Sequence, residues 1–414
     1  MTELERLIKE YCPNGVEYKT LGELGAFYGG LTGKSKDDFV DGNAKFITYM
    51  NVFSNIELNL DTKDAVQIGE NEKQNTIEYG DVLFTGSSET PDECGMSSVL
   101  TKHTEEKLYL NSFCFGFRFY DKELILPGFS KYLFRSEALR KQIKKTASGV
   151  TRFNVSKKKM EKVTIPIPPV EVQREIVRIL DNFAELTAEL TAELTMRKKQ
   201  YEYYREKLLK KSSNAVQKKF GDIFDFQNGF AFKSNLFKDS GDAILRITNI
   251  QESRILTNNI VFFDKSDYKE NLSPYLVRKG DIVVAMSGAT TGKIGVNRTS
   301  TNYYLNQRVG KFVPKKDIVL NRYLYHLLLQ NSEKIYAISQ GGAQPNLSSE
   351  KLKSLTALIP PISEQEQVIE ILDRYDSFCN DITIGLPAEI KARKNQYEYY
   401  RDKLLTFKEF NNCE

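Results

Sequence analysis

The sequence predicts an α+β protein in which two similar domains are each followed by a long helix. Two segments carry the same Pro-Pro…Gln…Ile-Leu-Asp pattern, one within residues 165–181 and the other within residues 358–373. A stretch at 200–209, QYEYYREKLL, returns at 396–405 as QYEYYRDKLL. Repeats of this length indicate that one structural plan is used twice. The segments that precede them alternate short apolar runs with polar turns, which is typical of strands.

Size and composition agree with a folded protein of several domains. The chain has 414 residues, of which 40% are hydrophobic, so packed cores are expected rather than disorder. No apolar run reaches the roughly 18–20 residues that a membrane helix needs, and the N-terminus has no signal-peptide core. We therefore expect a cytoplasmic protein with no membrane partner.

Cysteine and histidine usage argues against a metal site. The five cysteines are scattered without a Cys-x-x-Cys pair, so reduced structural thiols are expected. Neither His103 nor His326 has a Cys, Asp or Glu at metal-ligand spacing. The sequence therefore predicts no metal centre and no histidine-based catalytic triad.

Identical residues recur in the two halves of the chain at a fixed offset. Six residues recur 192 positions later: Pro168, Pro169, Gln173, Ile179, Leu180 and Asp181 return as Pro360, Pro361, Gln365, Ile371, Leu372 and Asp373. A weaker echo precedes them, in which Gly149, Asn154 and Ser156 correspond to Gly341, Asn346 and Ser348. Each half is thus a variable body followed by a similar tail.

The variable bodies predict strands with helices near their ends. In the first body the strand-like runs are AKFITYMNVF (44–53), DVLFTG (81–86) and NSFCFGFRFY (111–120). In the second they are AILRITNI (243–250), DIVVAMSG (281–288) and KIGVN (293–297). Residues 131–145 and 322–336 read as helical, so each body is α+β.

The tails predict long helices that pair with each other. No Gly or Pro interrupts the chain from about Glu171 to Leu209, and a helix of that length is roughly 58 Å long. Its apolar seam comprises Ile176, Leu180, Phe183, Leu186, Leu190 and Leu194, with Ile371 and Leu372 as packing positions in the second tail. Gly385-Leu386-Pro387 predicts a break in the second helix. We favour an antiparallel pair over two unrelated surface helices, because a long helix needs a partner along its length.

This arrangement resembles the specificity (S) subunit of type I restriction–modification enzymes, over essentially the whole chain. The most specific marks are the two Pro-Pro helix entries and the preceding Gly149-Val150-Thr151-Arg152-Phe153-Asn154-Val155-Ser156 segment. The second copy departs from this segment, with Ala343 and Gln344 where the first has Thr151 and Arg152. The AELT repeat at 184–195 is similar to spacers of this family.

The resemblance implies a non-catalytic subunit that reads a split DNA target. Residues 1–168 and 213–360 would be two target-recognition domains, and residues 169–212 and 361–414 would form an antiparallel coiled-coil spacer between them. Two methyltransferase (M) subunits, which use S-adenosylmethionine, would dock on the spacer. A restriction (R) subunit, which uses ATP with Mg²⁺, would join for cleavage of double-stranded DNA. No cofactor is expected in this chain.

Local charge supports contacts with DNA phosphates. The net charge of the chain is only +4, but residues 140–162 carry nine basic side chains and one acidic one. The first hundred residues carry 8 basic and 18 acidic side chains. Concentrated basic charge supplies affinity without sequence information, although a solvated helix face would look the same.

Base reading requires donors and acceptors on polar loops, and the sequence offers several of these loops. The candidate DNA-binding residues are Lys34, Ser35, Arg152, Asn154, Lys157, Lys158, Lys159, Lys233, Ser234, Ser287, Lys293, Gln344 and Asn346. Polar loops are common on any protein, and the target sequence does not follow from them.

The alternative is a stand-alone enzyme that cleaves or modifies DNA. GGLTGKS at 29–35 falls short of a phosphate-binding loop, because Tyr28 stands where that motif requires glycine. Pro91-Asp92 and Glu105-Glu106-Lys107 have the outline of a nuclease motif, but the second copy has no counterpart. The signatures of an amino-methyltransferase are absent. A third possibility, a coiled-coil scaffold with no DNA role, leaves the variable bodies without an explanation.

Overall fold

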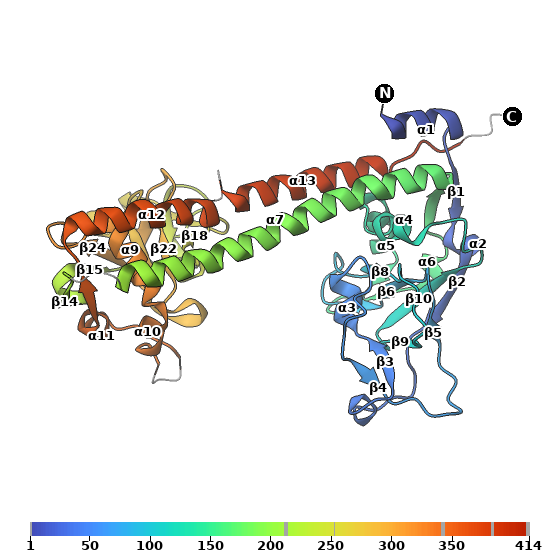
Figure 1. Cartoon of the computed structure of the whole chain (residues 1–414), viewed down its shortest axis with the longest axis horizontal. Helices are drawn as coiled ribbons and strands as arrows, with labels where there is room; N and C mark the ends of the chain where they lie inside the picture. The colour runs from blue at the N-terminus through green and yellow to red at the C-terminus, as the bar shows by residue number, and fades with distance from the viewer. Residues whose placement is uncertain (1, 211–213, 252, 341–343, 382–384, 411–414) are drawn as a thin grey trace. The chain divides into compact units, whose positions relative to one another are not determined.

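The computed structural model describes residues 2–210, 214–251, 253–340, 344–381 and 385–410. The chain divides into two compact units (Figure 1). The first unit comprises Met1–Ala188 and Ala392–Glu414, and the second comprises Glu189–Lys391. The boundary expected at 212/213 lies outside the described residues, as do Ala343 and Cys413.

The first unit contains two four-stranded sheets and two smaller ones. One sheet has the order β2-β10-β6-β8 and the other β4-β3-β9-β5, in which β3 and β9 are parallel. A two-stranded sheet pairs β1 with β13, and a three-stranded one has the order β11-β12-β7. The strands are β1 Glu17–Thr20, β2 Gly25–Gly29, β3 Ala44–Ile47, β4 Ala65–Val66, β5 Thr76–Ile77, β6 Val82–Thr85, β7 Ser87–Ser88, β8 Ser97–Val99, β9 Leu108–Leu110, β10 Cys114–Phe119, β11 Ala147–Ser148, β12 Phe153–Val155 and β13 Thr164–Ile167.

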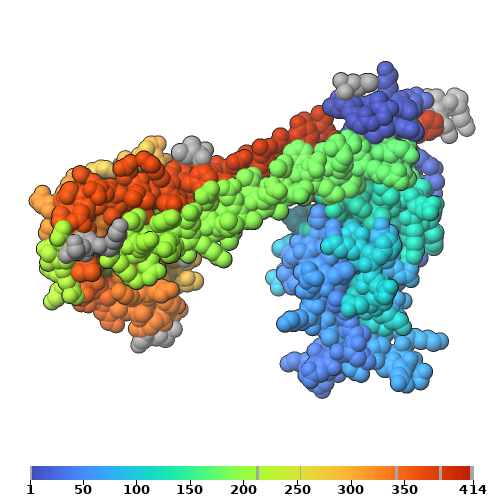
Figure 2. Space-filling model, viewed as in Figure 1, coloured from blue at the N-terminus to red at the C-terminus, as the bar shows by residue number. Residues whose placement is uncertain are grey.

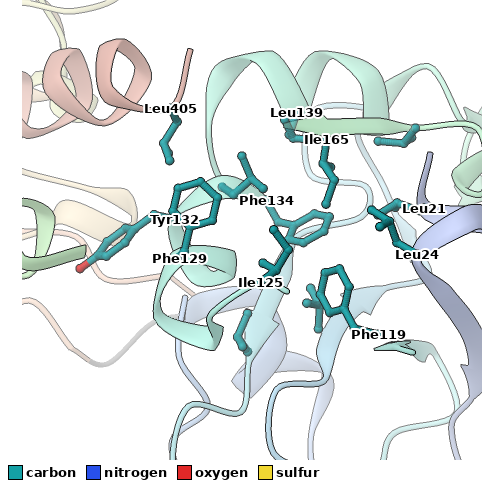
Figure 3. Packing of buried hydrophobic residues seen from close by; sticks show 14 of the residues in the cluster. Leu21, Leu24, Phe119, Ile125, Phe129, Tyr132, Phe134, Leu139, Ile165 and Leu405 are labelled. Carbon is teal, nitrogen blue, oxygen red and sulfur yellow. The ribbon is translucent and has the colours of Figure 1, made fainter. Parts of the chain in front are cut away.

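Short helices complete the first domain and cover its main core. They are α1 Glu3–Tyr11, α2 Leu21–Leu24, α3 Tyr49–Ser54, α4 Pro127–Leu133, α5 Glu137–Lys144 and α6 Lys157–Met160, with a 3-10 turn η1 at Asp37–Phe39. Figure 3 shows Phe129, Phe134 and Leu139 of this helical layer packed with Phe119 of β10. Aromatic and aliphatic side chains from α2, α4, α5 and β13 therefore form one continuous apolar core.

The second unit repeats the two large sheets and the terminal strand pair of the first, but has a two-stranded β17-β18 sheet and, in place of β11-β12-β7, an isolated bridge between Ser287 and Asn346. Its large sheets have the orders β15-β24-β21-β22 and β19-β16-β23-β20, again with one parallel pair, β16 with β23. β14 pairs with β25, as β1 does with β13. The strands are β14 Val216–Lys219, β15 Phe224–Asn228, β16 Asp242–Leu245, β17 Ile250–Gln251, β18 Arg254–Ile255, β19 Val261–Phe263, β20 Leu276–Val277, β21 Ile282–Ala285, β22 Ile294–Val296, β23 Tyr303–Leu305, β24 Val309–Pro314 and β25 Thr356–Ile359.

The helices of the second domain are also short. They are α8 Phe220–Ile223, α9 Asn321–Gln330, α10 Ser332–Ala337 and α11 Ser349–Ser354. The 3-10 turns are η2 Ser234–Leu236, η3 Ile247–Asn249, η4 Lys265–Asp267, η5 Ser273–Tyr275 and η6 Gly288–Thr290. The predicted helical segments 131–145 and 322–336 are thus confirmed as α4–α5 and α9–α10.

Two predicted strands are each only half a strand. The run AILRITNI (243–250) follows β16 only as far as Leu245 and then forms η3. The run AKFITYMNVF forms β3 over its first four residues, and the remainder folds as α3. The Thr48 side chain accepts a hydrogen bond from the Asn51 backbone N–H and so caps this helix. The sequence pattern missed the switch because Tyr, Val and Phe favour strands, and a local cap outweighed that preference.

The predicted long helices are present, and the second tail's helical part ends at Leu404. The first is α7, Val170–Lys210, and the second tail forms two helices, α12 Ile362–Asn380 and α13 Leu386–Leu404. The break predicted at Gly385-Leu386-Pro387 is confirmed, since α12 ends at Asn380 and α13 begins at Leu386. Proline at the second position of α13 lacks only an N–H that has no helical partner there.

In the second unit α7 runs antiparallel to α12. Figure 1 shows α7 ending beside the start of α12, and Figure 2 shows their surfaces against each other. Tyr204 stacks on Tyr375 with ring centroids 5.3 Å apart, and Tyr201, Leu372 and Cys379 form the buried centre of this contact. In the first unit the equivalent pair, Phe183 and Tyr400, stacks at 5.4 Å. The fold class is as predicted: two similar α+β domains with paired long helices.

Two of the predicted packing positions are wrong. Ile176, Leu180 and Leu372 are fully buried and Phe183, Leu190 and Leu194 are partly buried, but Leu186 is 46% exposed and Ile371 is 43% exposed. A helix turns about 100° per residue, so Ile371 cannot face the same partner as Leu372. By the same geometry Thr187, four residues after Phe183, continues the seam better than Leu186, which is three residues after it.

A buried glutamine joins each long helix to its own domain. Gln173 accepts a hydrogen bond from the Leu126 N–H at 2.8 Å and donates to the carbonyls of Leu124 and Pro168. Gln365 makes the same three bonds in the second domain, with Leu320, Ile318 and Pro360 at 2.9 Å. Both side chains are fully buried, so the recurrence of this glutamine in the sequence has a structural cause.

Candidate nucleic-acid interface

In the first domain the Gly149–Ser156 segment is held against the end of β6. Asn154 pairs with Ser87, and the Val155 N–H donates to the Gly86 carbonyl at 2.9 Å. The buried Cys94 thiol donates to the carbonyl of Phe153. These contacts fix a hairpin, residues 147–156, whose polar side chains face outward; we call it the first hairpin segment.

The second domain builds the same arrangement from different residues. Ser287 pairs with Asn346, and the Leu347 N–H donates to the Met286 carbonyl at 2.8 Å. Thr291 stands in the place of Cys94: its Oγ1 donates to the Gly288 carbonyl at 2.6 Å and also lies 3.3 Å from the carbonyl of Pro345. The second hairpin segment, described at residues 339–340 and 344–348, therefore occupies the equivalent place. Five predicted residues, Arg152, Asn154, Ser287, Gln344 and Asn346, belong to these two sites.

An exposed aromatic and two cations surround the first hairpin segment. The Arg152 guanidinium lies over the ring of Phe113, 5.6 Å from its centroid, and the Lys157 ammonium lies 5.8 Å from the centroid of Phe115. Phe113 is 58% exposed at the turn between β9 and β10. A Cβ on Gly29 would lie 3.7 Å from the Lys157 Nζ, so β2 also reaches this place. An open ring and positive charge side by side suit contacts with bases and phosphates.

The basic cluster at 140–162 separates into internal and external residues. Arg140 donates to the carbonyls of Asp92, Cys94 and Gly95, and burial lowers the pKa of its guanidinium. Lys141 pairs with Glu137 at 2.6 Å, and Lys144 pairs with Asp92. Three consecutive lysines of α6, namely Lys157, Lys158 and Lys159, are exposed, and no ion pair to a described residue occupies them. The positive charge available to a ligand therefore includes three adjacent ammoniums on α6, besides those of the exposed Lys145 and Lys162.

Lys34 is used inside the first domain. Its ammonium donates to the carbonyl of Gln67 at 2.6 Å and to Glu72 at 2.5 Å, and its side chain is only 9% exposed. This contact lowers the pKa of the Glu72 carboxyl to about 2. Ser35 is exposed, and both its N–H and its hydroxyl donate to Asp38 at 2.7 Å. The Lys34 ammonium is therefore held inside the domain and does not face a ligand.

The remaining candidates of the second domain lie apart from its hairpin segment or are already bonded. Lys233 and Ser234 are exposed at the start of η2, and the Lys233 N–H donates to the hydroxyl of Tyr268. The Lys293 ammonium donates to the side-chain carbonyl of Gln251 at 2.9 Å. The sequence analysis did not predict Phe113. The available signal was its place two residues after Tyr-Leu-Asn at 109–111, a tripeptide that returns at 304–306.

The buried histidine belongs to a structural network in the second unit. His326 Nε2 lies 2.7 Å from the carboxylate of Asp373, and its Nδ1 lies 2.9 Å from the hydroxyl of Tyr201. Arg322 bonds both Asp373 and Asp376 at 2.7 Å. These contacts tie α9 to α7 and α12. Across the residues that the structure describes, no group of three or more His, Cys, Asp or Glu could hold a metal ion.

Comparison with protein families identifies this architecture. The model of the type I restriction modification DNA specificity domain matches residues 13–196 and again residues 213–392. The chain belongs to this family. The two matches correspond to the two repeated halves of this chain, and each contains one hairpin segment.

Individual relatives agree with the family assignment. A putative type I restriction enzyme specificity subunit of Haemophilus influenzae is 35% identical over 272 residues, which cover 63% of this chain and 68% of that protein. The EcoR124I/EcoR124II specificity subunit of Escherichia coli is 35% identical over 264 residues, which cover 61% of this chain and 65% of that one. The alignments thus span about two thirds of each of these relatives.

Solved structures show that the fold is shared along the whole chain. The S subunit of a type I restriction-modification system from M. genitalium has a TM-score of 0.55 and 14% identity, covering 94% of this chain and 96% of its own. A second structure, of a type I R-M system studied for its complex assembly and conformational transition, has a TM-score of 0.60 and 16% identity, covering 95% and 98%. Among the helices that the structure describes, none has the length and apolar character of a membrane span.

Proposed function

We propose that this chain is the non-catalytic subunit that selects the DNA target of a type I restriction–modification enzyme. Residues 1–168 would read one half of a split target and residues 213–360 the other half. Residues 169–212 and 361–414 would form the spacer between the two readers. The observation that carries the proposal is that one polar hairpin site is built twice, on two copies of one topology, from different surface residues.

DNA contacts are proposed for the exposed residues around the hairpin segments. In the first domain Lys157, Lys158 and Lys159, together with Arg152, would contact phosphates, while Asn154 would reach base edges. In the second domain Ser287, Gln344 and Asn346 hold the equivalent places. Phosphate contacts set affinity and register, and only the contacts to base edges distinguish sequences. The variation between the two sites is what two different half-targets would require.

The repeated tails support docking of two copies of one partner. Tyr203 on α7 and Tyr399 on α13 are 57% and 61% exposed, and each carries a lysine ammonium near its ring, from Lys207 at 5.7 Å and Lys403 at 5.8 Å. Exposed tyrosines anchor protein interfaces more often than most side chains do. We therefore propose that two methyltransferase (M) subunits, carrying S-adenosylmethionine, dock on these two surfaces. A restriction (R) subunit with ATP and Mg²⁺ would complete the enzyme.

A domain exchange tests the two-reader proposal. Residues 213–357 are replaced by the corresponding domain of a relative, and the methylated motif is mapped genome-wide in cells that hold the methyltransferase subunits. One half of the motif should change and the other should stay the same. A change in both halves, or in neither, would contradict the proposal. As a matched control, exchange of residues 13–167 should change the opposite half.

A separate experiment tests whether the chain itself is an enzyme. The purified chain is incubated with DNA and S-adenosylmethionine, or with DNA and Mg²⁺, with no other subunit present. Methylation or cleavage by the chain alone would favour the stand-alone enzyme. Methylation that requires the M subunits, and that is lost in Tyr203→Ala/Tyr399→Ala protein with unchanged circular dichroism, would support the docking proposal.

A further inference from the structure

The turn that carries Phe113 has an equivalent in the second domain, and its aromatic residue is replaced by Arg308. Asn111 and Asn306 begin the two turns, and in each the asparagine carbonyl accepts the backbone N–H three residues later, at 2.9 Å and 2.8 Å. The next contact is also shared: Gly86 N–H donates to the Phe113 carbonyl at 2.7 Å, and Met286 N–H donates to the Arg308 carbonyl at 2.9 Å.

In each domain a glycine passes very close to the turn, which confirms that the turns are equivalent. This glycine directly follows a strand: Gly30 follows β2, and Gly229 follows β15. A Cβ on Gly30 would lie 2.1 Å from the Asn111 carbonyl oxygen, and a Cβ on Gly229 would lie 1.9 Å from that of Asn306. Both distances are far shorter than any real contact, so only glycine permits the strand to pass the turn there. Phe113 and Arg308 are therefore matched by position and by backbone contacts, although the residues have nothing in common chemically.

The hairpin segment shows the opposite exchange. Arg152, two residues before Asn154, corresponds to Gln344, two residues before Asn346. The first domain thus has an arginine on the hairpin beside an aromatic ring on the turn. The second domain has a neutral glutamine on the hairpin and an arginine on the turn. One guanidinium is retained at each site, but it is supplied by a different segment of the chain.

Several other cations of the second domain are already paired. Five of them bond to carboxylates: Lys238 to Asp267, Lys265 to Asp242, Arg298 to Asp376, Lys311 to Asp281 and Arg322 to Asp373. The Arg308 side chain is exposed, and within the described part of the chain no hydrogen bond or ion pair occupies its guanidinium. Its charge is therefore available to a ligand beside Ser287 and the second hairpin segment.

We infer that Arg308 supplies in the second domain the phosphate contact that Arg152 supplies in the first. This inference rests on the proposed DNA-reading function and names a residue that has no chemical likeness to its counterpart Phe113. A guanidinium can bond a phosphate in a fork and neutralise its charge, which a glutamine at the hairpin cannot do.

The test moves the arginine back to the hairpin. Binding of a fluorescein-labelled random-sequence duplex to the chain in complex with its methyltransferase subunits is measured between about 50 and 200 mM salt. Arg308→Phe should weaken binding and reduce the slope of log K against log salt by about 0.9, the value for one lost phosphate contact. Arg308→Phe/Gln344→Arg, which reproduces the residue pair of the first domain, should restore both the slope and the affinity.

Two controls separate this inference from folding and from the proposed function. Lys316→Ala removes an exposed cation beyond the opposite end of β24 and should leave the slope unchanged. Circular dichroism shows whether each variant is folded. An unchanged slope in Arg308→Phe, or no restoration in the double variant, would overturn the inference. Failure of the wild-type complex to bind any duplex would instead refute the DNA-reading function.

Discussion

Three consecutive lysines on α6 allow the phosphate contacts of the first domain to be counted. Each lost contact should reduce the salt slope by about 0.9, so that one contact changes affinity about 3.5-fold between 50 and 200 mM salt. Lys157→Ala alone should therefore reduce the slope by about 0.9, because its ammonium lies over Phe115 beside the hairpin segment.

The triple variant sets an upper limit. Successive helical residues point about 100° apart, so Lys157, Lys158 and Lys159 fan out and need not all reach one DNA backbone. Lys157→Ala/Lys158→Ala/Lys159→Ala should reduce the slope by between about 0.9 and 2.7, or up to about 40-fold in relative affinity over this salt range.

Fluorescence anisotropy with a random-sequence duplex measures these slopes, and a paired lysine provides the matched control. Lys141→Ala removes the same charge from α5, where Glu137 already compensates it at 2.6 Å, and should change the slope little. If the α6 variants keep the wild-type slope while folded, or if Lys141→Ala has the larger effect, α6 is a solvent-exposed face and not a phosphate contact.

Three further predictions concern stability and spacing. Gln365→Ala should destabilise the second domain by about 2–4 kcal/mol, because it leaves three buried backbone groups without partners. Hydrogen exchange should accelerate in α12 but not in the first domain. Gln173→Ala should instead accelerate exchange in the first domain and leave α12 unchanged. Burial lowers the pKa of His326, so the folded domain binds this proton less readily than the unfolded chain, and its stability should fall as the pH drops below about 6.5. Thermal melts at pH 7.5 and 5.5 should show this loss, and His326→Gln should remove it; Asp373, with a pKa of about 2, adds a loss only below about pH 4. Deleting Thr191–Leu194 removes about 6 Å of α7 and should shorten the unread gap between the half-targets by about one base pair, with both half-sequences unchanged in methylation maps; an active variant with an unaltered gap would contradict this.

The architecture was predictable because its determinants are local and repeated. Helix α7 follows from forty residues without Gly or Pro, and the break before α13 follows from Gly385 and Pro387. The buried glutamines recur because each caps the same three backbone groups of its own domain. Where two local preferences competed, as at 48–53, the pattern predicted a strand and the Thr48 cap produced a helix instead.

The sequence by itself determined that there are two copies of one plan, that the tails are long helices and that basic charge gathers before the first of them. Only the tertiary structure decided which cations are available. Lys34 and Arg140 look like surface charges in the sequence, but their partners lie 38 and about 46 residues away in the chain and use their donors internally. The Tyr-Leu-Asn repeat at 109–111 and 304–306 puts Phe113 and Arg308 at the same offset, but only the backbone contacts of the folded turns show that each lies beside the hairpin segment of its own domain.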